Sequence, residues 1–197
     1  MELSIVLQAG GKSSRMGQDK GLLDFGGVSL AQFILEQVDG LGAETIIISN
    51  QPEAYQQFGL PVYPDVYPDI GALGGLYSAI YHAKFEYCLL LACDMPFVSR
   101  PLVEHLISLA PDYDAVIPRL EPKEFAEPFR AVYKKSCLKP IEGAIKSGQR
   151  RVISFFDEVD IRFVDQPEIE SIDPQGRSFF NINTPEDLEH ARSMLKS

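Results

Sequence analysis

Short apolar runs alternate along this chain with segments in which apolar residues recur at helical spacing. Several runs are β-branched and apolar throughout, which is typical of strands buried on both faces of a parallel sheet. The pattern therefore predicts strands at Leu3–Leu7, Thr45–Ser49, Pro61–Tyr63, Tyr87–Ala92 and Ala115–Pro118.

The segments between these runs predict helices. Leu30–Leu41 has apolar residues at positions 30, 33, 34, 38 and 41, which form one stripe of an amphipathic helix ending at Gly40 or Gly42. Helices are also expected at 71–83 and 101–110, with Pro101 as the first helical residue of the second. Alternating strands and helices predict an α/β fold of three layers, with a doubly wound, mostly parallel sheet and right-handed crossovers.

The second half of the chain is less regular. We expect a strand over 125–133 that leads into a helix over Lys134–Lys146, and another strand at 161–165. A final helix has Thr184 as its N-cap, Pro185 in the first turn and Asp187 where a capping box has its acid. A chain of 197 residues fits a single domain, 1–197, with a sizeable core.

Composition excludes several classes of function. The net charge of −10 argues against binding to nucleic acids or anionic membranes, because both need a broad basic face. The longest apolar run, Cys88 to Cys93, is too short to span a bilayer, and no secretion signal is evident, so we expect a cytoplasmic protein. The spacing of the three cysteines predicts buried thiols instead of a disulfide or a zinc site.

The stretch LQAGGKSSRMGQDK, residues 7–20, follows the first strand and contains most of the local chemistry. It is not a Walker A motif, because Val6 stands where the first glycine is required, and the GxGxxG dinucleotide fingerprint also fails. Gly10 and Gly11 leave backbone N–H groups open to a phosphate, and Arg15 and Lys20 supply positive charge. A solvated loop remains the alternative, but a simple turn would not need those two cations.

The run AGGKSSRMGQDKGLLDFGG resembles the signature of the MobA-like nucleotidyltransferases, in which a short hairpin follows the loop. Further pieces of the chain resemble the same family: IIISN at 46–50, VYPD at 62–65, IGALGGL at 70–76, ACDMP at 92–96 and NINTPEDL at 181–188. The resemblance implies a Rossmann-like nucleotidyltransferase fold. It also implies a nucleotide-binding half over 1–118 and an acceptor-side half over 119–197.

The family resemblance also implies roles for individual residues on the nucleotide side. Main-chain contacts to the nucleotide are expected from Ala9, Gly10 and Gly11, and phosphate contacts from Lys20. Further nucleotide contacts are expected from Asn50 or its neighbour Ser49, from Asp65 or Asp69, and from Asp94. The implied catalytic residues are Arg15, Lys20 and Asp94, and Asp94 is also the implied Mg²⁺ ligand.

Asp94 is a candidate independently of the family. It follows the apolar strand CLLLAC, so its carboxylate should emerge at the carboxyl edge of the sheet, where ligands bind in such folds. The alternative is that this acid caps the helix that begins near Pro101. Gln8, at the end of the first strand, could hydrogen-bond a base edge or simply brace the loop.

On the acceptor side, the resemblance points to Asn181 and Asn183, and to Arg150 and Arg151 in a basic stretch facing the pterin. The alternative role of both asparagines is to cap the entrance of the final helix, which could be the whole role of Asn183.

The implied activity is Mg²⁺-dependent transfer of GMP from GTP to molybdopterin, with pyrophosphate as the second product. The implied partners are GTP, molybdopterin and proteins that handle molybdopterin or use the finished cofactor. Two alternatives remain open: a cytidylyl- or other nucleotidyltransferase with a different phosphorylated acceptor, and a non-catalytic nucleotide-binding regulator. The joint presence of Lys20 and Asp94 argues against the regulator.

Overall fold

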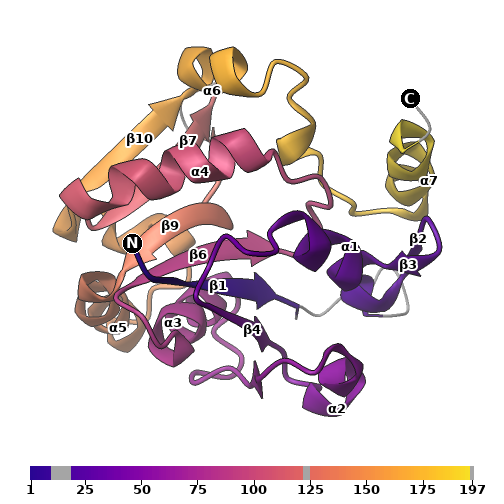
Figure 1. Ribbon diagram of the computed structural model, residues 1–197. Coiled ribbons are helices and arrows are strands. Elements are labelled where there is room, and N and C mark those ends of the chain that lie inside the picture. Colours follow the sequence, from indigo (N-terminus) through magenta and orange to yellow (C-terminus); the bar gives the residue numbers. More distant parts are fainter. Residues whose placement is uncertain (10–18, 122–124, 196–197) are drawn as a thin grey trace.

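The computed structural model describes residues 1–9, 19–121 and 125–195, and its centre is a mixed β-sheet (Figure 1). The strand order is β10-β7-β9-β6-β1-β4-β5, with β8 paired to the outer part of β7. β1 is parallel to β4 and β6, β4 to β5, and β7 to β10, whereas β9 is antiparallel to both of its neighbours. The strands of this sheet are β1 (Leu3–Gln8), β4 (Glu44–Ile48), β5 (Val62–Tyr63), β6 (Tyr87–Ala92), β7 (Ala115–Leu120), β8 (Phe125–Ala126), β9 (Arg130–Lys134) and β10 (Ile161–Asp165).

Helices cover both faces of the sheet and complete a three-layer fold, as Figure 1 shows. One face packs against α3 and α5, and the other against α1, α4 and α6. The α-helices are α1 (Leu30–Gln37), α2 (Pro52–Tyr55), α3 (Ala72–His82), α4 (Arg100–Leu109), α5 (Leu138–Lys146), α6 (Gln166–Ile172) and α7 (Pro185–Met194). The 3₁₀ helices are η1 (Lys20–Leu22), η2 (Gln56–Phe58), η3 (Ala110–Asp112), η4 (Lys135–Cys137), η5 (Val152–Glu158) and η6 (Arg177–Phe179). The predicted α/β class and mostly parallel sheet are confirmed.

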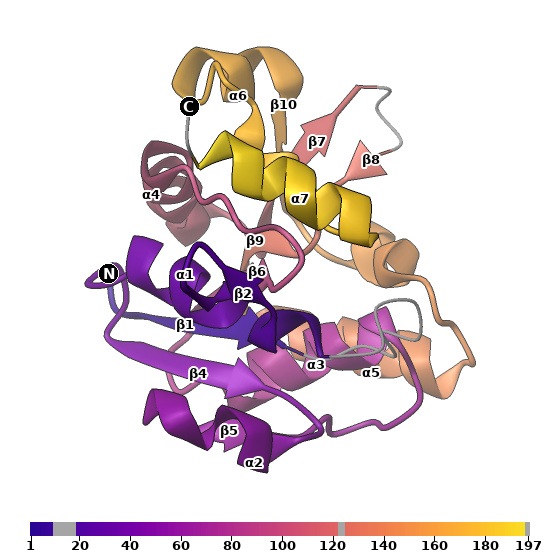
Figure 2. The same ribbon diagram turned by 90° about the vertical axis from the view of Figure 1, so that its right-hand side faces the viewer.

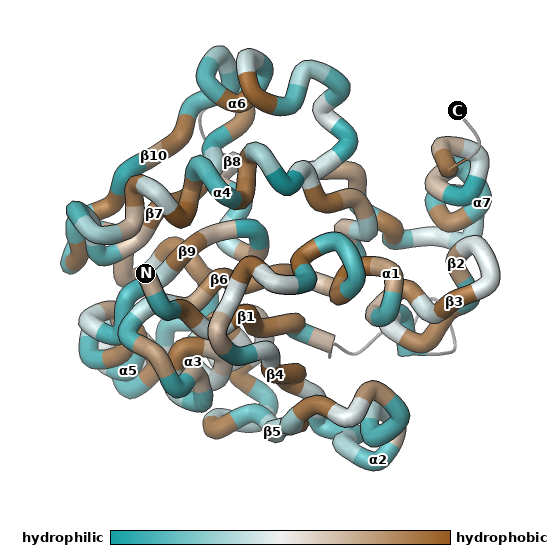
Figure 3. Tube along the Cα trace, viewed as in Figure 1, coloured by the Kyte–Doolittle hydropathy of each residue, from teal (hydrophilic) through white to brown (hydrophobic). Residues whose placement is uncertain are grey.

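The central strands are apolar on both faces, which explains their continuous hydrophobic runs in the sequence. In β1, Ile5 and Leu7 pack toward α1 and α4, while Val6 packs toward α3 on the opposite face. Figure 3 shows the result, with apolar central strands inside and hydrophilic stretches on the surrounding helices and loops. The continuous apolar pattern is therefore that of buried strands in a three-layer fold.

A third, smaller core joins the two ends of the chain. Phe25 of the hairpin β2 (Asp24–Phe25) and β3 (Val28–Ser29) is fully buried, and it packs with Leu30 of α1 and with Leu188 of α7. Ile182, just before α7, belongs to the same cluster. Figure 2 shows α7 lying across the front of the molecule, and this small core is what holds the segment before α7 near the hairpin.

Several sequence-based boundaries need correction. The single strand expected over 125–133 is two strands, because the chain turns between β8 and β9 at Glu127–Phe129, where Pro128 has no N–H for a sheet ladder. Helix α5 then begins only after η4, and α1 ends at Gln37 before a turn through Gly40, whose φ is 72°. Pro101 is the second helical residue of α4, after Arg100.

Other expectations about the fold hold. The N-cap at Thr184 and the full capping box with Asp187 are present at the start of α7. The three cysteines are buried and unpaired, as predicted. Within the part of the chain that the structure describes, none of the helices has the length and apolar character to cross a membrane.

Candidate active site

Lys20, Asp94 and Asn183 come from three distant parts of the chain and meet at the carboxyl edge of the sheet. The Lys20 ammonium group donates hydrogen bonds to the Ile182 carbonyl oxygen at 2.7 Å and to Asn183 Oδ1 at 3.1 Å. It also lies 3.6 Å from Asp94 Oδ2. The lysine therefore lies beside an acid and is held in place by two uncharged oxygens.

The backbone explains why Asp94 lies at this point. β6 ends at Ala92, and the Met95 N–H turns back to bond the Ala92 carbonyl, so the intervening acid projects from the sheet edge. The Asp94 carbonyl then accepts a hydrogen bond from Ile182 N at 2.8 Å. The alternative role for Asp94, capping the next helix, is wrong, because Ser99 occupies the N-cap position of α4.

Both charged side chains of this pair remain partly open to solvent. The Asp94 side chain is 33% exposed and the Lys20 side chain 19% exposed. The carboxylate can therefore accept a further ligand, while the lysine is mostly enclosed and aimed by its partners. An anionic substrate placed here would meet a cation whose direction is already fixed.

Asn50 and Asp65 form a second polar pair at the ends of β4 and β5. Asn50 Nδ2 donates to Asp65 Oδ2 at 2.8 Å, and the Asp65 backbone N–H donates to Asn50 Oδ1 at 2.9 Å. The other carboxylate oxygen, Asp65 Oδ1, is buried and has no hydrogen-bond partner among the described residues. This orphaned acceptor is suited to an O–H or N–H group of a bound nucleotide.

The rival residues beside this pair have different surroundings. Ser49 is buried, its N–H bonds the Tyr63 carbonyl, and its hydroxyl accepts from the Gln51 N–H. Asp69 lies in a turn with a φ of 62°, and its carbonyl accepts a hydrogen bond from Arg150. The side-chain pairing thus joins Asn50 to Asp65, and their contacts to a nucleotide stay a prediction.

The loop that opens the site is described only at its two ends. Ala9 is fully buried, and its N–H bonds the Ile48 carbonyl at 2.9 Å, so the loop leaves the sheet from a fixed point. Gly10, Gly11 and Arg15 lie outside the described residues, and their predicted roles stay predictions. The Gln8 side chain packs against Gly75 so closely that a Cβ there would lie 2.9 Å from Gln8 Nε2, a contact that braces β1 against α3.

The acceptor-side residues are distributed over different segments. Asn183 belongs to the site, and its side chain bonds Lys20 while Thr184 serves as the helix N-cap, so the capping alternative for Asn183 is wrong. Asn181 lies two residues earlier in the same segment. Arg150 donates to the Asp69 carbonyl at 3.3 Å, and Arg151 is the exposed N-cap residue of η5. No contact among the described residues joins these two arginines to Lys20, and their roles toward the pterin stay predictions.

Sequence reasoning missed a buried charge beneath Asp94. Arg130 of β9 is fully buried, and its Nη2 donates to the Met95 carbonyl at 2.7 Å. Its Nε and Nη1 have no hydrogen-bond partner among the described residues. Burial lowers the pKa of Arg130 to about 10, against the opposing charges of Glu127 and Asp94, so the guanidinium stays charged near neutral pH. The signal was an arginine inside the apolar run FRAVY.

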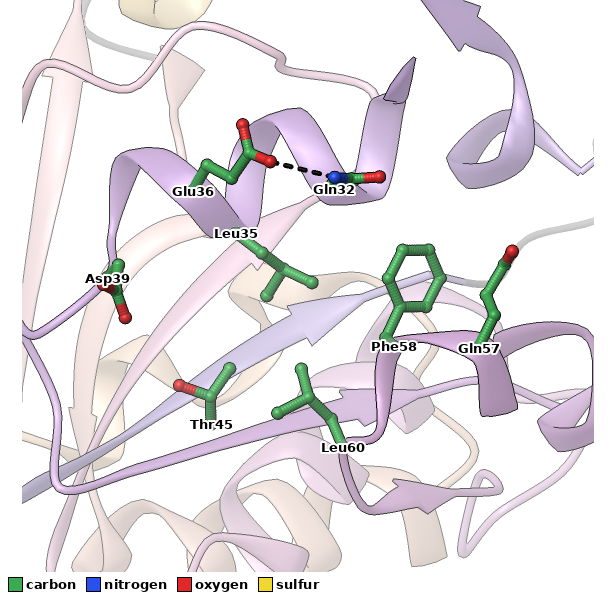
Figure 4. Close-up of a pocket in the computed structure, with 8 residues that line it drawn as sticks. All are labelled: Gln32, Leu35, Glu36, Asp39, Thr45, Gln57, Phe58 and Leu60. Carbon is green, nitrogen blue, oxygen red and sulfur yellow. Dashed lines mark hydrogen bonds between the residues drawn. The ribbon is translucent and has the colours of Figure 1, made fainter.

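A groove elsewhere on the molecule does not contain these residues. It has a volume of about 500 Å³ and lies between α1, β4 and η2 (Figure 4). Leu35, Phe58 and Leu60 line it together with Glu36, whose carboxylate accepts a hydrogen bond from Gln32 at 2.9 Å. It therefore has no part in the chemistry of Lys20 and Asp94.

The donor atoms at the site suit a magnesium ion that is bound partly by substrate. Among the described residues, no group of three or more His, Cys, Asp or Glu side chains could form a metal cage. Mg²⁺ usually takes one or two carboxylates, several waters and substrate phosphates. One accessible carboxylate, that of Asp94, fits this arrangement.

Comparisons with known proteins identify the family of this chain. A family model described as MobA-like NTP transferase domain matches residues 5–161. A probable molybdenum cofactor guanylyltransferase from Clostridium perfringens (strain 13 / Type A) is 37% identical over 189 residues, which cover 94% of this chain and 94% of that protein.

Solved structures show the same fold. The crystal structure of molybdopterin-guanine dinucleotide biosynthesis protein A from Archaeoglobus fulgidus aligns with a TM-score of 0.84 and 26% identity, covering 98% of both chains. The 2-C-methyl-D-erythritol 4-phosphate cytidylyltransferase from Thermus thermophilus has a TM-score of 0.76 at 18% identity over the full length of both chains. The last of these shows the fold alone. With the signature loop at the end of β1 and the family model matched over most of the chain, this protein belongs to the MobA-like nucleotidyltransferase family.

Proposed function

We propose that this protein transfers GMP from GTP to molybdopterin, giving molybdopterin guanine dinucleotide and pyrophosphate, and that the reaction needs Mg²⁺. The observation that carries the proposal is the meeting of Lys20, Asp94 and Asn183 at the carboxyl edge of the sheet. The Clostridium perfringens relative, named as a probable molybdenum cofactor guanylyltransferase, supports the choice of substrates.

The chain's own residues contribute positioning and charge. An oxygen of the acceptor's terminal phosphate forms a bond to the α-phosphorus of GTP while the bond to the β-phosphate oxygen breaks, and pyrophosphate leaves. The attacking phosphate is already an anion, so neither a covalent enzyme intermediate nor a strong base is required. Lys20 neutralises charge on the phosphates, and Asn183 together with the Ile182 carbonyl holds that ammonium in place.

Asp94 is the residue that would hold a magnesium ion. A bound Mg²⁺ would neutralise phosphate charge as it develops, a contribution worth several kcal/mol. Asp94 supplies the anionic oxygen, and its neighbour Lys20 limits the remaining negative charge at the site. The Asn50–Asp65 pair, with its orphaned carboxylate oxygen, is the proposed contact for the nucleoside.

The decisive experiment measures pyrophosphate release with each of the four nucleoside triphosphates, with and without molybdopterin, across a magnesium titration. We expect turnover with GTP and molybdopterin together. Lys20→Ala should remove a charge-assisted contact worth roughly 1.5–3 kcal/mol, or about 10- to 150-fold in kcat/KM. Asp94→Asn should lower the rate on the order of a hundredfold and keep more of the GTP binding.

Matched variants separate these effects from general loss of charge. Lys84→Ala and Asp112→Asn alter residues that precede β6 and β7, at the opposite ends of the strands from the site, and should leave turnover unchanged. Turnover with CTP instead of GTP would replace the guanylyl assignment with a cytidylyl one. GTP binding without pyrophosphate release from any acceptor would favour a nucleotide-binding regulator.

A further inference from the structure

The residue before Lys20 is tied to a buried tyrosine far along the chain. Asp19 Oδ1 accepts a hydrogen bond from the Tyr55 hydroxyl at 2.6 Å and another from the Gly21 backbone N–H at 3.1 Å. Tyr55 is the last residue of α2 and is completely buried. One carboxylate oxygen thus joins the start of η1 to the core.

The fit around this contact is close. A Cβ built at position 21 would collide with the Tyr55 hydroxyl and lie 3.2 Å from Cys93 Sγ. Only glycine at this position allows the tyrosine to approach Asp19. The phenol remains a hydrogen-bond donor, because burial raises its pKa, with smaller contributions from Cys93 and Asp19.

The geometry links the contact to the active site. Asp19 is the N-cap residue of η1, and Lys20 is its first helical residue, so the Asp19 backbone sets the direction in which the lysine leaves. From there the Lys20 ammonium reaches Ile182, Asn183 and Asp94. The Tyr55 hydroxyl makes no described contact with any of these three residues.

We propose that Tyr55 is a positioning residue for nucleotide transfer: its hydroxyl fixes Asp19, and Asp19 fixes the backbone from which Lys20 reaches the phosphates. The proposal rests on the proposed function for its effect on catalysis. Its geometric part, the aiming of Lys20, holds or fails independently of which substrate the enzyme takes.

The first test needs no substrate. In the wild-type protein, acetic anhydride labelling followed by mass spectrometry should modify the enclosed Lys20 more slowly than Lys84. Tyr55→Phe keeps the ring and removes the hydroxyl, so labelling of Lys20 should rise several-fold while Lys84 stays constant. Unchanged Lys20 labelling would overturn the proposal, whatever the reaction proves to be.

The second test measures function against a matched tyrosine. Tyr133 is also completely buried, and its hydroxyl donates a hydrogen bond to the Pro128 carbonyl at 2.8 Å. Tyr55→Phe should lower kcat/KM for GTP about tenfold, which corresponds to the loss of one hydrogen bond worth about 1.4 kcal/mol. Tyr133→Phe should lower the Tm by about as much as Tyr55→Phe does, but it should keep kcat/KM within about twofold of the wild-type value. Equal activity losses in both variants would mean that the effect is only structural.

Variants of Asp19 and Lys20 complete the test. Asp19→Asn keeps an oxygen that can accept hydrogen bonds from both Tyr55 and Gly21, so its GTP affinity should be close to that of the wild type. Asp19→Ala loses this acceptor, so its GTP affinity and Lys20 labelling should match those of Tyr55→Phe. In a Lys20→Ala background, Tyr55→Phe should not weaken GTP binding further by calorimetry. A further tenfold loss in that background, or an Asp19→Asn variant as impaired as Asp19→Ala, would show that Tyr55 does not act by aiming Lys20.

Discussion

At the scale of single residues, the charge of the buried Arg130 guanidinium affects the pKa of Glu127. Burial raises the pKa of Glu127, and the charge of Arg130 lowers it, while Asp94 adds a raising effect. A carboxyl whose pKa is raised on folding lowers the free energy of unfolding once the pH exceeds its unfolded pKa. This penalty grows until the pH passes the folded pKa, and it is absent below the unfolded pKa. Removing Arg130 should enlarge that penalty near neutral pH.

We therefore expect Arg130→Met to destabilise the protein more at about pH 7 than at about pH 4. Urea unfolding at the two pH values measures the difference. In the double variant Arg130→Met/Glu127→Gln, the excess pH dependence should become smaller, because only the coupling of Arg130 to Asp94 and Asp173 is then lost. If the loss of stability is the same at both pH values, Arg130 and Glu127 are not coupled.

Residues of the site differ in how far the sequence could predict them. Lys20, Asp94 and Asn183 were predicted because they stand in short motifs at the ends of predicted elements. Tyr55 and Arg130 were not, because their importance comes from burial beside Asp19 and Met95, and those neighbours are distant in sequence. Local patterns report residue type and spacing, but not which polar groups share one interior space.

At the scale of elements, the capping box of α7 also supports the site. Thr184 Oγ1 accepts from the Asp187 N–H, and Asp187 Oδ2 accepts from the backbone N–H groups of Thr184 and Asn183. The segment fixed in this way carries the Ile182 carbonyl and the Asn183 side chain that hold Lys20. Fraying of this helix start would therefore release two partners of the lysine.

Thr184→Ala should lower the free energy of unfolding by about 1 kcal/mol and also weaken GTP binding. Ser29→Ala is a matched control, because Ser29 caps α1 through a hydrogen bond from the Gln32 N–H at 3.2 Å and is absent from the described contacts of the Lys20 side chain. It should lower stability similarly and leave GTP affinity unchanged by calorimetry. GTP affinity that falls equally in both variants would indicate a general loss of stability.

The pH dependence of this helix start follows from Asp187. Backbone N–H groups of Asn183 and Thr184 hold the pKa of its carboxyl below the ordinary value. A lowered pKa stabilises the fold above the unfolded pKa, and the contribution is lost as the pH falls through the folded pKa. The stability of Asp187→Asn, measured by urea unfolding, should accordingly differ most from wild type at neutral pH and least in acid.

Elements were predictable where the signals are local. The α7 start was predicted because its capping residues lie within four positions of one another. The division between β8 and β9 was missed although Pro128 is a local signal for it, because no local pattern reports that β8 pairs with β7 while β9 lies between β6 and β7. The short helix α2 was also missed, because its four residues include one buried residue, Tyr55, and therefore show no repeating apolar pattern.

At the scale of the whole molecule, the sheet order interleaves the two halves of the chain. β9 lies between β6 and β7, and residue 118, the boundary drawn between the halves from the sequence, falls inside β7. Chain 1–118 would therefore lack the partner that joins its last strand to the sheet. Each of the three apolar clusters contains residues from both halves of the chain.

We expect the full chain to unfold in urea as one cooperative transition, because neither half has a complete sheet. Far-ultraviolet circular dichroism and tyrosine fluorescence should give coincident curves. The chain has no tryptophan, and of its eight tyrosines only Tyr133 lies after residue 118, so the fluorescence reports mainly on residues 1–118 and the circular dichroism on the whole chain. A fragment of residues 1–118 should remain largely unfolded. Two separated transitions, or a folded fragment, would contradict this expectation.

The hydrogen bond between Lys20 and Ile182 spans 162 residues, and this separation has a consequence for protein synthesis. A ribosome that adds about 5–20 residues per second needs on the order of 10 s to make the intervening chain. During that time the signature loop and Lys20 exist without the carbonyl and amide that aim the ammonium. The nascent chain therefore contains its phosphate-binding groups early. Its lysine becomes oriented only when the segment before α7 has been synthesised and has packed against the rest of the chain.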